Sequence, residues 1–252
     1  MTFINEHSFK CLLGPQAKDI NIIDNIYSWR VNKKLHFSTL KTLTDSDLCI
    51  LQSIGSSNFH YLSEENALFL KQHFETHKTK GRSIILDIED LSLNGGQYKK
   101  LRQTFKKCDK NQFEILNNFK HIDDIIKMIK EWSNEYTDKY FRDFSGKNSF
   151  FYRNSFHLNC LSLFIYSQND LVAFGTLSQP INEQSSYIIG KALYKRFYGL
   201  SEYTDIMLYR EAVKYGIKRI NMGRASNKNL LFYKLKFPKS KEEIYYDGSI
   251  KI

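Results

Sequence analysis

The chain has 252 residues, 42% of them hydrophobic and 15% aromatic, which is enough to bury a sizeable core and excludes an intrinsically disordered protein. The formal net charge is +10, from 37 Lys and Arg against 27 Asp and Glu, and such a charge favours anionic partners. No run of about 18 apolar residues occurs and the N-terminus lacks a secretory pattern, so we expect no transmembrane helix and a cytoplasmic protein.

The spacing of cysteines and histidines predicts neither disulfides nor a metal centre. Cys11, Cys49, Cys108 and Cys160 are far apart, and no Cys-x-x-Cys pair is present. Widely spaced cysteines are typical of reduced thiols in a cytoplasmic protein. Two of the seven histidines lie four residues apart, but no third ligand accompanies them in the sequence.

The first half of the chain predicts alternating strands and helices. Residues 47–52 form a short apolar run that we interpret as a buried strand. Residues 63–77 have helical spacing of apolar side chains, with Ser63 as the N-cap. Residues 83–88 are rich in Ile and predict another strand, and residues 98–108 predict a basic helix.

The second half begins with a predicted strand and a long amphipathic helix. Residues 112–116 predict the strand, and residues 121–140 predict the helix. The polar segment 167–170 separates two apolar runs, 160–166 and 171–177, which indicates a β-hairpin. Residues 187–194 can add a third antiparallel strand.

The last quarter reads as strand, turn, helix, strand, short helix and strand. The turn is residues 196–201, and the helix is residues 202–215. Residues 219–223 predict the next strand, and residues 232–237 follow it. A Gly-containing turn before a helix directs backbone N–H groups and the positive end of the helix dipole to one point. Such a point suits a phosphate or a developing oxyanion.

Positive charge is concentrated in two segments. Between residues 191 and 241 the chain has thirteen Lys and Arg but only three acidic residues. A smaller cluster lies on the predicted helix 98–108 and just after it. Both segments attract phosphates, nucleic acid or anionic lipid, and both are also compatible with an ordinary Lys-rich surface.

The last quarter resembles the GNAT acyltransferase superfamily. There an Arg-x-x-Gly-x-Gly/Ala turn holds the pyrophosphate of coenzyme A, and this chain keeps Arg196 and Gly199 but has Ser201 at the last small position. Ser201 can also serve as the N-cap of the following helix. Phe232 lies where the family often has a general-acid Tyr, and Tyr233 is the next residue.

Two more segments resemble tandem-GNAT proteins, namely the Fem aminoacyltransferases and the soluble domain of phosphatidylglycerol lysyltransferases. Residues 91–108 resemble the Gly- and Leu-Arg-containing segment between the two halves, and residues 222–237 resemble the Leu-x-x-Phe/Tyr-Lys-x-Lys-Phe signature.

The resemblance implies a mixed α/β (α+β) GNAT-like fold in two tandem halves, with central mixed sheets flanked by helices. We expect a degenerate half at 1–110 and a donor-binding half at 111–252. At residues 190–194 the chain lacks the acidic residue of the lysyltransferases.

Four residues are candidates for the chemistry of acyl transfer, which needs a stabilised oxyanion and a proton for the leaving group. The resemblance places Lys234 near the donor ester, although a surface position on a short helix is the alternative. Arg224 follows a strand end and either stabilises charge or forms a salt bridge. Asp205 is a candidate base or amine-binding group, or it only complements the helix dipole. Tyr233 is a candidate proton donor, or an aromatic packing residue.

Four further residues are candidates for donor binding. Arg196, Gly199 and Ser201 would form the donor-phosphate turn, and the alternative is an ordinary strand-to-helix connection. Lys236 is a second cation near Lys234, although a helix would direct the two side chains differently.

The resemblance implies an acyl or aminoacyl transferase whose donor is acyl-CoA or aminoacyl-tRNA and whose acceptor is an amine or hydroxyl of a small molecule, peptide or lipid. The turn favours a CoA thioester, whereas the basic charge and the tandem-type segments favour tRNA. Peripheral contact with an anionic membrane is compatible with the charge, and no metal is expected. The alternative is a non-catalytic GNAT-like module that binds RNA or an anionic surface.

Overall fold

The computed structural model describes residues 16–39, 41–89, 91–135, 153, 160–178, 180, 183–193, 195–225 and 227–252. Cys11, the predicted helical extension 136–140, Tyr194 and Ser226 lie outside these residues. Within the described part of the chain, no helix is long and apolar enough to cross a membrane.

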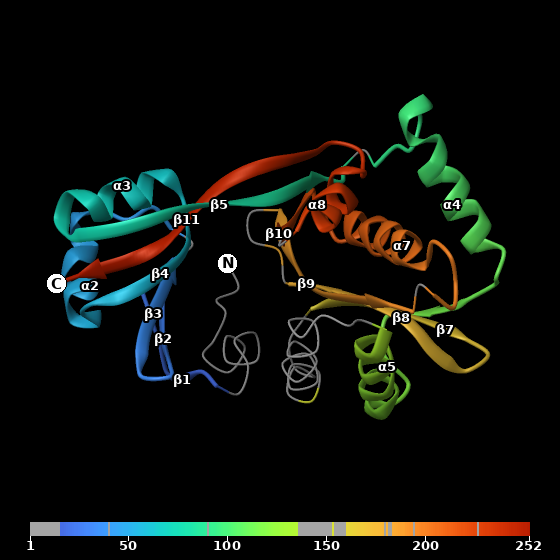
Figure 1. Cartoon of the computed structure of the whole chain (residues 1–252), viewed down its shortest axis with the longest axis horizontal. Helices are drawn as coiled ribbons and strands as arrows, with labels where there is room; N and C mark the ends of the chain where they lie inside the picture. Colours follow the sequence, from blue (N-terminus) through green and yellow to red (C-terminus); the bar gives the residue numbers. More distant parts are fainter. Residues whose placement is uncertain are drawn as a thin grey trace. The chain divides into compact units, whose positions relative to one another are not determined.

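The chain divides into two compact units (Figure 1). The larger unit contains Ile84–Lys241, and the smaller one contains Phe3–Ser83 together with Glu242–Ile252. Strands β5 (Glu75–Asp87) and β11 (Ser240–Lys251) each have residues in both units. The sequence suggested a division after residue 110, whereas these units divide after residues 83 and 241. Two tandem halves with a boundary at 110 therefore stay a prediction.

The larger unit has a mixed sheet with the strand order β5-β10-β9-β8-β7-β6. Strands β6 to β9 are antiparallel neighbours, and β10 is parallel to β9. The paired positions of the parallel strands run from Arg219 with Gln184 to Asn221 with Ser186. The bounds are β6 (Glu114–Leu116), β7 (Leu161–Ser167), β8 (Asp170–Leu177), β9 (Gln184–Ala192) and β10 (Arg219–Arg224).

Helices cover both faces of this sheet, with α7 (Leu200–Lys214) and α5 (Ile122–Glu135) on opposite sides (Figure 1). Alternate residues of β7 explain the arrangement, because successive side chains of a strand point to opposite faces. Leu163 and Ile165 belong to the core cluster that includes the buried side of α7, whereas Phe164 packs edge-on against Phe119. Among the described residues, this unit also has the α-helices α4 (Lys99–Asp109) and α8 (Lys228–Leu235).

The smaller unit has a sheet with the order β1-β2-β3-β4-β11-β5 and a core of its own. Strands β1 to β3 are antiparallel, β4 is parallel to β3, and β11 is antiparallel to β4. Phe37, Leu51, Phe59 and Leu70 are completely buried in that core. The bounds are β1 (Lys18–Ile23), β2 (Ile26–Val31), β3 (Lys34–Thr39), α2 (Leu48–Ile54), β4 (Ser57–Leu62) and α3 (Glu64–His73).

Most predicted elements are confirmed. The Ser63 side chain accepts a hydrogen bond from the backbone of Asn66, so Ser63 is the N-cap of α3 as predicted. The predicted hairpin is β7–β8, and its turn residues Gln168 and Asn169 have φ of 51° and 71°. Such left-handed values match the twist of a tight hairpin. The third antiparallel strand is β9.

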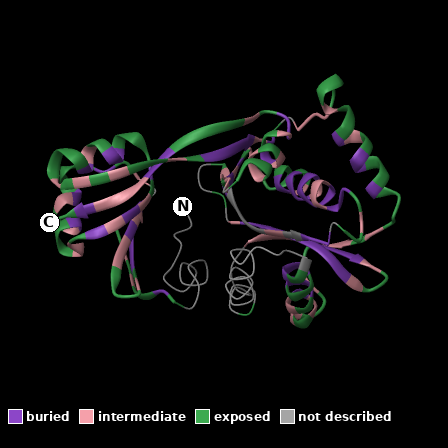
Figure 2. Cartoon of the chain, viewed as in Figure 1, coloured by how far each residue is buried: buried purple, intermediate pink, exposed green. Residues whose placement is uncertain are grey.

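Two predictions for the smaller unit are wrong. Residues 47–52, expected as a strand, belong mainly to helix α2, because Asp47 accepts a hydrogen bond from the backbone of Thr44 and ends a short 3-10 turn that leads into the helix. The helix expected to reach residue 77 ends at His73, and β5 starts at Glu75. Figure 2 shows that only part of this long strand is buried, which explains why its polar first half gave no strand pattern.

Candidate active site

A carboxylate and a phenol meet between α7 and α8. Asp205 lies in the second turn of α7 and is 5% exposed. Tyr233 lies in the last turns of α8 and donates a hydrogen bond of 2.6 Å from its hydroxyl to Asp205 Oδ2. A short bond to a carboxylate in a site with little water is among the stronger hydrogen bonds in proteins. Asp205 and Tyr233 are therefore held as a pair.

A second charged pair adjoins the first. Lys236 Nζ lies 2.6 Å from Glu202 Oε1, and the two side chains are 22% and 24% exposed. The same ammonium lies 3.8 Å from the centre of the Tyr233 ring, a cation–π contact. Burial lowers the pKa of Lys236, while Glu202 and Asp205 act in the opposite direction. Lys236 is thus a partly desolvated cation beside Tyr233.

Lys234 is buried, with 8% of its surface exposed. Its Nζ donates to the carbonyl oxygens of Met222, Gly223 at 3.0 Å and Arg224 at 2.9 Å. Desolvation lowers the pKa of Lys234 to about 8, and the negative charge of Asp205 opposes this shift. The surface position considered from the sequence is wrong, because all three ammonium hydrogens have acceptors at the end of β10.

The end of β10 is shaped to receive this lysine. Gly223 has a φ of 70°, and its amide donates to the side chain of Asn221 at 2.8 Å. Successive carbonyls of a regular strand point in opposite directions. The left-handed residue breaks that alternation, which glycine allows at little cost. Three consecutive carbonyls can therefore face one ammonium.

Arg224 and Phe232 contribute less to the cluster. The carbonyl of Arg224 binds Lys234, whereas its side chain is exposed. Phe232 is 77% exposed and has no hydroxyl, while Tyr233 points to Asp205. A role of the Arg224 guanidinium in charge stabilisation stays a prediction.

The predicted donor-phosphate turn is packed tightly against α4. Gly199 is the N-cap of α7 with a φ of 84°, and a Cβ there would lie 2.2 Å from Cγ2 of Thr104. The prediction of Ser201 as N-cap is wrong, because α7 starts at Leu200 and Ser201 lies inside its first turn. The backbone amides of Arg196 and Phe197 donate to the carbonyl of Leu193 at 3.0 and 3.2 Å.

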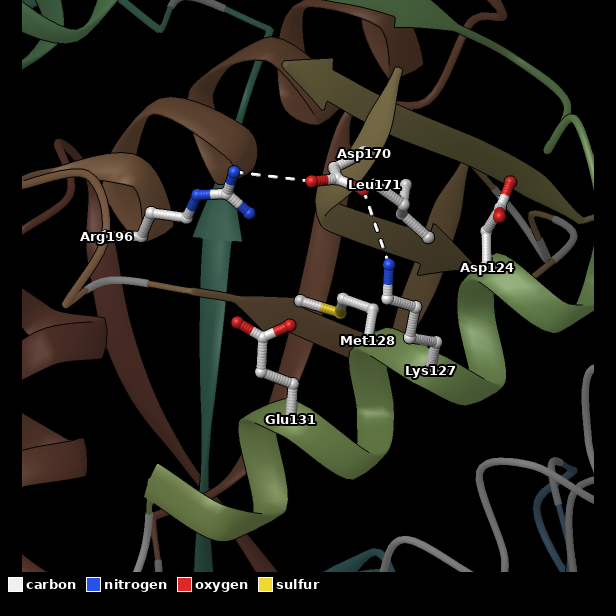
Figure 3. A pocket seen from close by; sticks show the side chains of 7 residues that line it. All are labelled: Asp124, Lys127, Met128, Glu131, Asp170, Leu171 and Arg196. Carbon is white, nitrogen blue, oxygen red and sulfur yellow. Dashed lines mark hydrogen bonds and ion pairs between the residues drawn. The ribbon is translucent and has the colours of Figure 1, made fainter. Parts of the chain in front are cut away.

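Arg196 lines a different, small pocket (Figure 3). Its Nη2 lies 3.3 Å from Asp170 Oδ2, and Lys127 of α5 lies 3.4 Å from the other oxygen of that carboxylate. The bond from Arg196 is the main reason that the pKa of Asp170 is lowered. The pocket has a volume of about 20 Å³, enough for roughly one water molecule. Donor binding by Arg196, Gly199 and Ser201 stays a prediction.

The structure thus brings together four of the eight predicted residues, namely Asp205, Tyr233, Lys234 and Lys236. Sequence reasoning missed Glu202, the partner of Lys236. A signal existed, because Glu202 and Asp205 are three residues apart and share one face of a helix. Among the described residues, no group of three or more His, Cys, Asp or Glu side chains could hold a metal ion.

The family described as "Phosphatidylglycerol lysyltransferase, C-terminal" matches residues 54–243. The chain belongs to this family. Both Lys234 and the Asp205–Tyr233 pair lie inside the segment that matches the phosphatidylglycerol lysyltransferase C-terminal family. No curated protein matches the chain.

Solved structures confirm the fold of this lysyltransferase-family member. A conserved protein of unknown function from Bacteroides thetaiotaomicron has a TM-score of 0.75 at 13% identity, with 98% of this chain and 90% of that chain covered. L-PGS from Bacillus licheniformis has a TM-score of 0.69 at 13% identity, covering 98% and 87%. FemX has a TM-score of 0.62 at 10% identity, covering 96% and 89%. The fold is GNAT-like and of the Fem and lysyltransferase type.

Proposed function

We propose that this protein is an aminoacyltransferase that moves an aminoacyl group from aminoacyl-tRNA to an amine or hydroxyl acceptor. Its family is described by a lysyltransferase activity, and FemX shares its fold. The observation that carries the proposal is the cluster in which Tyr233 donates to Asp205 beneath the Lys236 ammonium. It combines a proton-transfer pair with a cation, as acyl transfer requires.

The Tyr233–Asp205 pair can move the proton of the reaction. The acceptor nitrogen or oxygen forms a bond with the ester carbonyl carbon, and its proton passes to the Tyr233 oxygen while the Tyr233 proton passes to Asp205. The bond between that carbon and the ribose oxygen then breaks. The proton returns from Asp205 through Tyr233 to the leaving ribose oxygen, so the pair ends as it began.

The two lysines have different electrostatic roles in this proposal. Lys236 is partly exposed and can reach a bound donor, where its charge would stabilise the tetrahedral oxyanion or a nearby phosphate. Lys234 donates its ammonium hydrogens to the carbonyls at the end of β10, so its role is to position that strand end rather than to contact the donor. It fixes the strand end and adds positive charge near Asp205.

Part of the turn before α7 is engaged in contacts within the protein, which supports tRNA rather than CoA as the donor. A pyrophosphate needs several unoccupied backbone N–H groups. Here the amides of Arg196 and Phe197 donate to the carbonyl of Leu193, the amide of Leu200 donates to that of Phe197, and the Arg196 side chain binds Asp170. A charged tRNA as donor implies a cytoplasmic site of action, and the acceptor is the amine or hydroxyl of a lipid, peptide or small molecule.

A label-transfer assay tests this proposal. The purified protein is incubated with total tRNA charged with one radioactive amino acid at a time, together with lipid, peptide and small-molecule acceptor fractions. We expect label to move from tRNA into one acceptor fraction for one or a few amino acids, and to stop doing so with Tyr233→Phe. Salt-sensitive tRNA binding with no transfer for any amino acid would instead indicate the non-catalytic module.

A further inference from the structure

Helix α4 carries lysines along the whole of its exposed face. Its buried side is formed by Leu101, Thr104, Phe105 and Cys108, which pack in the core of the larger unit (Figure 2). On the opposite side Lys99, Lys106 and Lys110 form one stripe, because residues seven and eleven positions apart lie on the same face of a helix. The stripe is about 16 Å long. Lys100 and Lys107 lie beside it and complete the basic face, defined as these five lysines.

The charge of the basic face is not balanced locally. Within the described part of the chain, none of its five lysines forms an ion pair. The acidic residue of the helix, Asp109, accepts a hydrogen bond of 3.0 Å from the hydroxyl of Tyr203 on α7. Arg102 donates to the carbonyl of Gly95 at 2.8 Å and so holds the preceding loop. The charge of the five lysines is therefore available to a partner.

Helix α4 packs beside α7, and Lys100 links its basic face to the candidate active site. Phe105 of α4 stacks on Tyr203, the residue after Glu202, with ring centres 4.9 Å apart. Lys100 is close enough for its charge to contribute to the lowered pKa of Lys236. Arg210 of α7 lies 4.7 Å from the ring of Phe105 and adds an exposed cation beside α4. The stripe itself faces away from α7, so a partner on the basic face approaches the proposed reaction centre at the edge where Lys100 lies.

The composition of this face favours RNA over a membrane. A helix that binds a lipid surface inserts its apolar side between the lipids. The apolar side of α4 is already buried in the core, so only charge and surface polar groups remain. One exposed aromatic ring, Tyr198, is 65% exposed and lies 5.5 Å from Lys107 Nζ. Lysines with an adjacent exposed ring are typical of surfaces that bind a nucleic-acid backbone and stack a base.

We propose that the basic face of α4 binds the phosphate backbone of the tRNA donor and brings its aminoacyl end to the Tyr233–Asp205 pair. This inference rests on the proposed function for the identity of the RNA. The binding is electrostatic and sequence-independent, so it depends strongly on salt. Tyr198 provides a stacking surface at the edge of the face.

The test compares two triple variants that remove the same charge. One replaces Lys99, Lys106 and Lys110 with Gln. The matched control replaces three exposed lysines of the smaller unit, Lys18, Lys71 and Lys80, with Gln. Binding of fluorescent uncharged tRNA is measured by anisotropy between 0.05 and 0.3 M salt, on the order used for such titrations. Binding to phosphatidylglycerol vesicles and thermal unfolding are measured in parallel.

We expect the α4 variant to bind tRNA about 30- to 100-fold more weakly near 0.15 M salt. The slope of log binding constant against log salt concentration should become shallower by roughly two to three units. The control variant should stay within about threefold of the natural protein in tRNA affinity. Unchanged tRNA binding by a folded α4 variant overturns the inference, as does loss of vesicle binding with tRNA binding intact. If α4-dependent tRNA binding is found but no amino acid is ever transferred, this inference stands and the proposed function fails.

Discussion

Tyr233 and Asp205 are 28 positions apart in the sequence, and a 2.6 Å hydrogen bond joins them across the interface of α8 and α7. Asp205 is almost fully buried, so the bond satisfies a carboxylate that would otherwise be costly to desolvate. The bond also fixes the direction in which the Tyr233 proton can move. A single interaction thus links the packing of the two helices with the proposed proton transfer.

The first prediction concerns this pair. Tyr233→Phe and Asp205→Asn should each lower the rate of aminoacyl transfer by about 10²- to 10⁴-fold, because each change breaks the proton path. The double variant should lose little more than either single variant, because the residues act as a unit. Single-turnover rates measure the effect. Tyr215→Phe, at a 60% exposed position at the C-terminal end of α7, is the control and should keep the natural rate.

The second prediction concerns Glu202. Its negative charge raises the pKa of Lys236 against the effect of burial, so Glu202→Gln should lower that pKa further. If the Lys236 ammonium is needed for transfer, the rate of the variant will fall at a lower pH than the rate of the natural protein when both are followed into alkaline solution. Glu211→Gln removes an exposed-side ion pair with Lys214 on the same helix and should leave the profile unchanged. An identical alkaline limb in Glu202→Gln would count against a role for the pair.

The third prediction concerns Lys234. Its pKa is lowered to about 8 in the folded protein, against 10.5 for an ordinary lysine. Between these two pH values the unfolded chain binds a proton that the folded protein does not bind, so stability rises with pH across this window. The unfolding free energy of the natural protein should therefore rise relative to that of Lys234→Met, by up to about 3 kcal/mol.

Denaturant titrations at several pH values between 8 and 10.5 measure this difference. Groups that titrate in both proteins cancel in the comparison. The control is Lys228→Met, which removes an exposed lysine at the start of the same helix. Its unfolding free energy should change with pH in the same way as that of the natural protein. Parallel curves for Lys234→Met as well would show that the lysine is not desolvated in solution.

The fourth prediction concerns the contact between Gly199 and Thr104. Gly199→Ala should destabilise the protein by about 2–4 kcal/mol, since the φ of 84° disfavours a side chain and the new Cβ would overlap Cγ2 of Thr104. Thr104→Ser removes that methyl group. The double variant should therefore be more stable than Gly199→Ala alone, although the conformational cost of about 1–2 kcal/mol remains. Denaturant midpoints measure all three variants, and a double variant no better than Gly199→Ala would refute the contact.

The sequence predicted elements whose signals are local. The hairpin at residues 167–170 and the cap at Ser63 are examples, because turn and cap chemistry depends on a few neighbouring residues. The run 47–52 was misread because four consecutive apolar residues suit a buried strand or a short helix equally. The hydrogen bond from the backbone of Thr44 to the Asp47 side chain caps this segment and favours the helix.

The site was predictable in part. Resemblance to a family motif drew attention to Lys234, Lys236 and Tyr233, which the structure brings together with Asp205. Their partners were not predictable, because Lys234 lies on helix α8 whereas the carbonyls that bind it come from strand β10 and converge only through the left-handed Gly223. Likewise, the bond of Arg196 to Asp170 joins the turn to a hairpin 26 positions away.

The proposed reaction requires aminoacyl-tRNA as the donor and proton transfer by the Tyr233–Asp205 pair. The most direct measurement follows the loss of the ester bond from charged tRNA and, in a parallel reaction, the release of free thiol from acyl-CoA. We expect acceptor-dependent loss of the tRNA ester with the natural protein, at least about 100-fold slower loss with Tyr233→Phe, and no thiol release. Thiol release from acyl-CoA with an intact tRNA ester would contradict it.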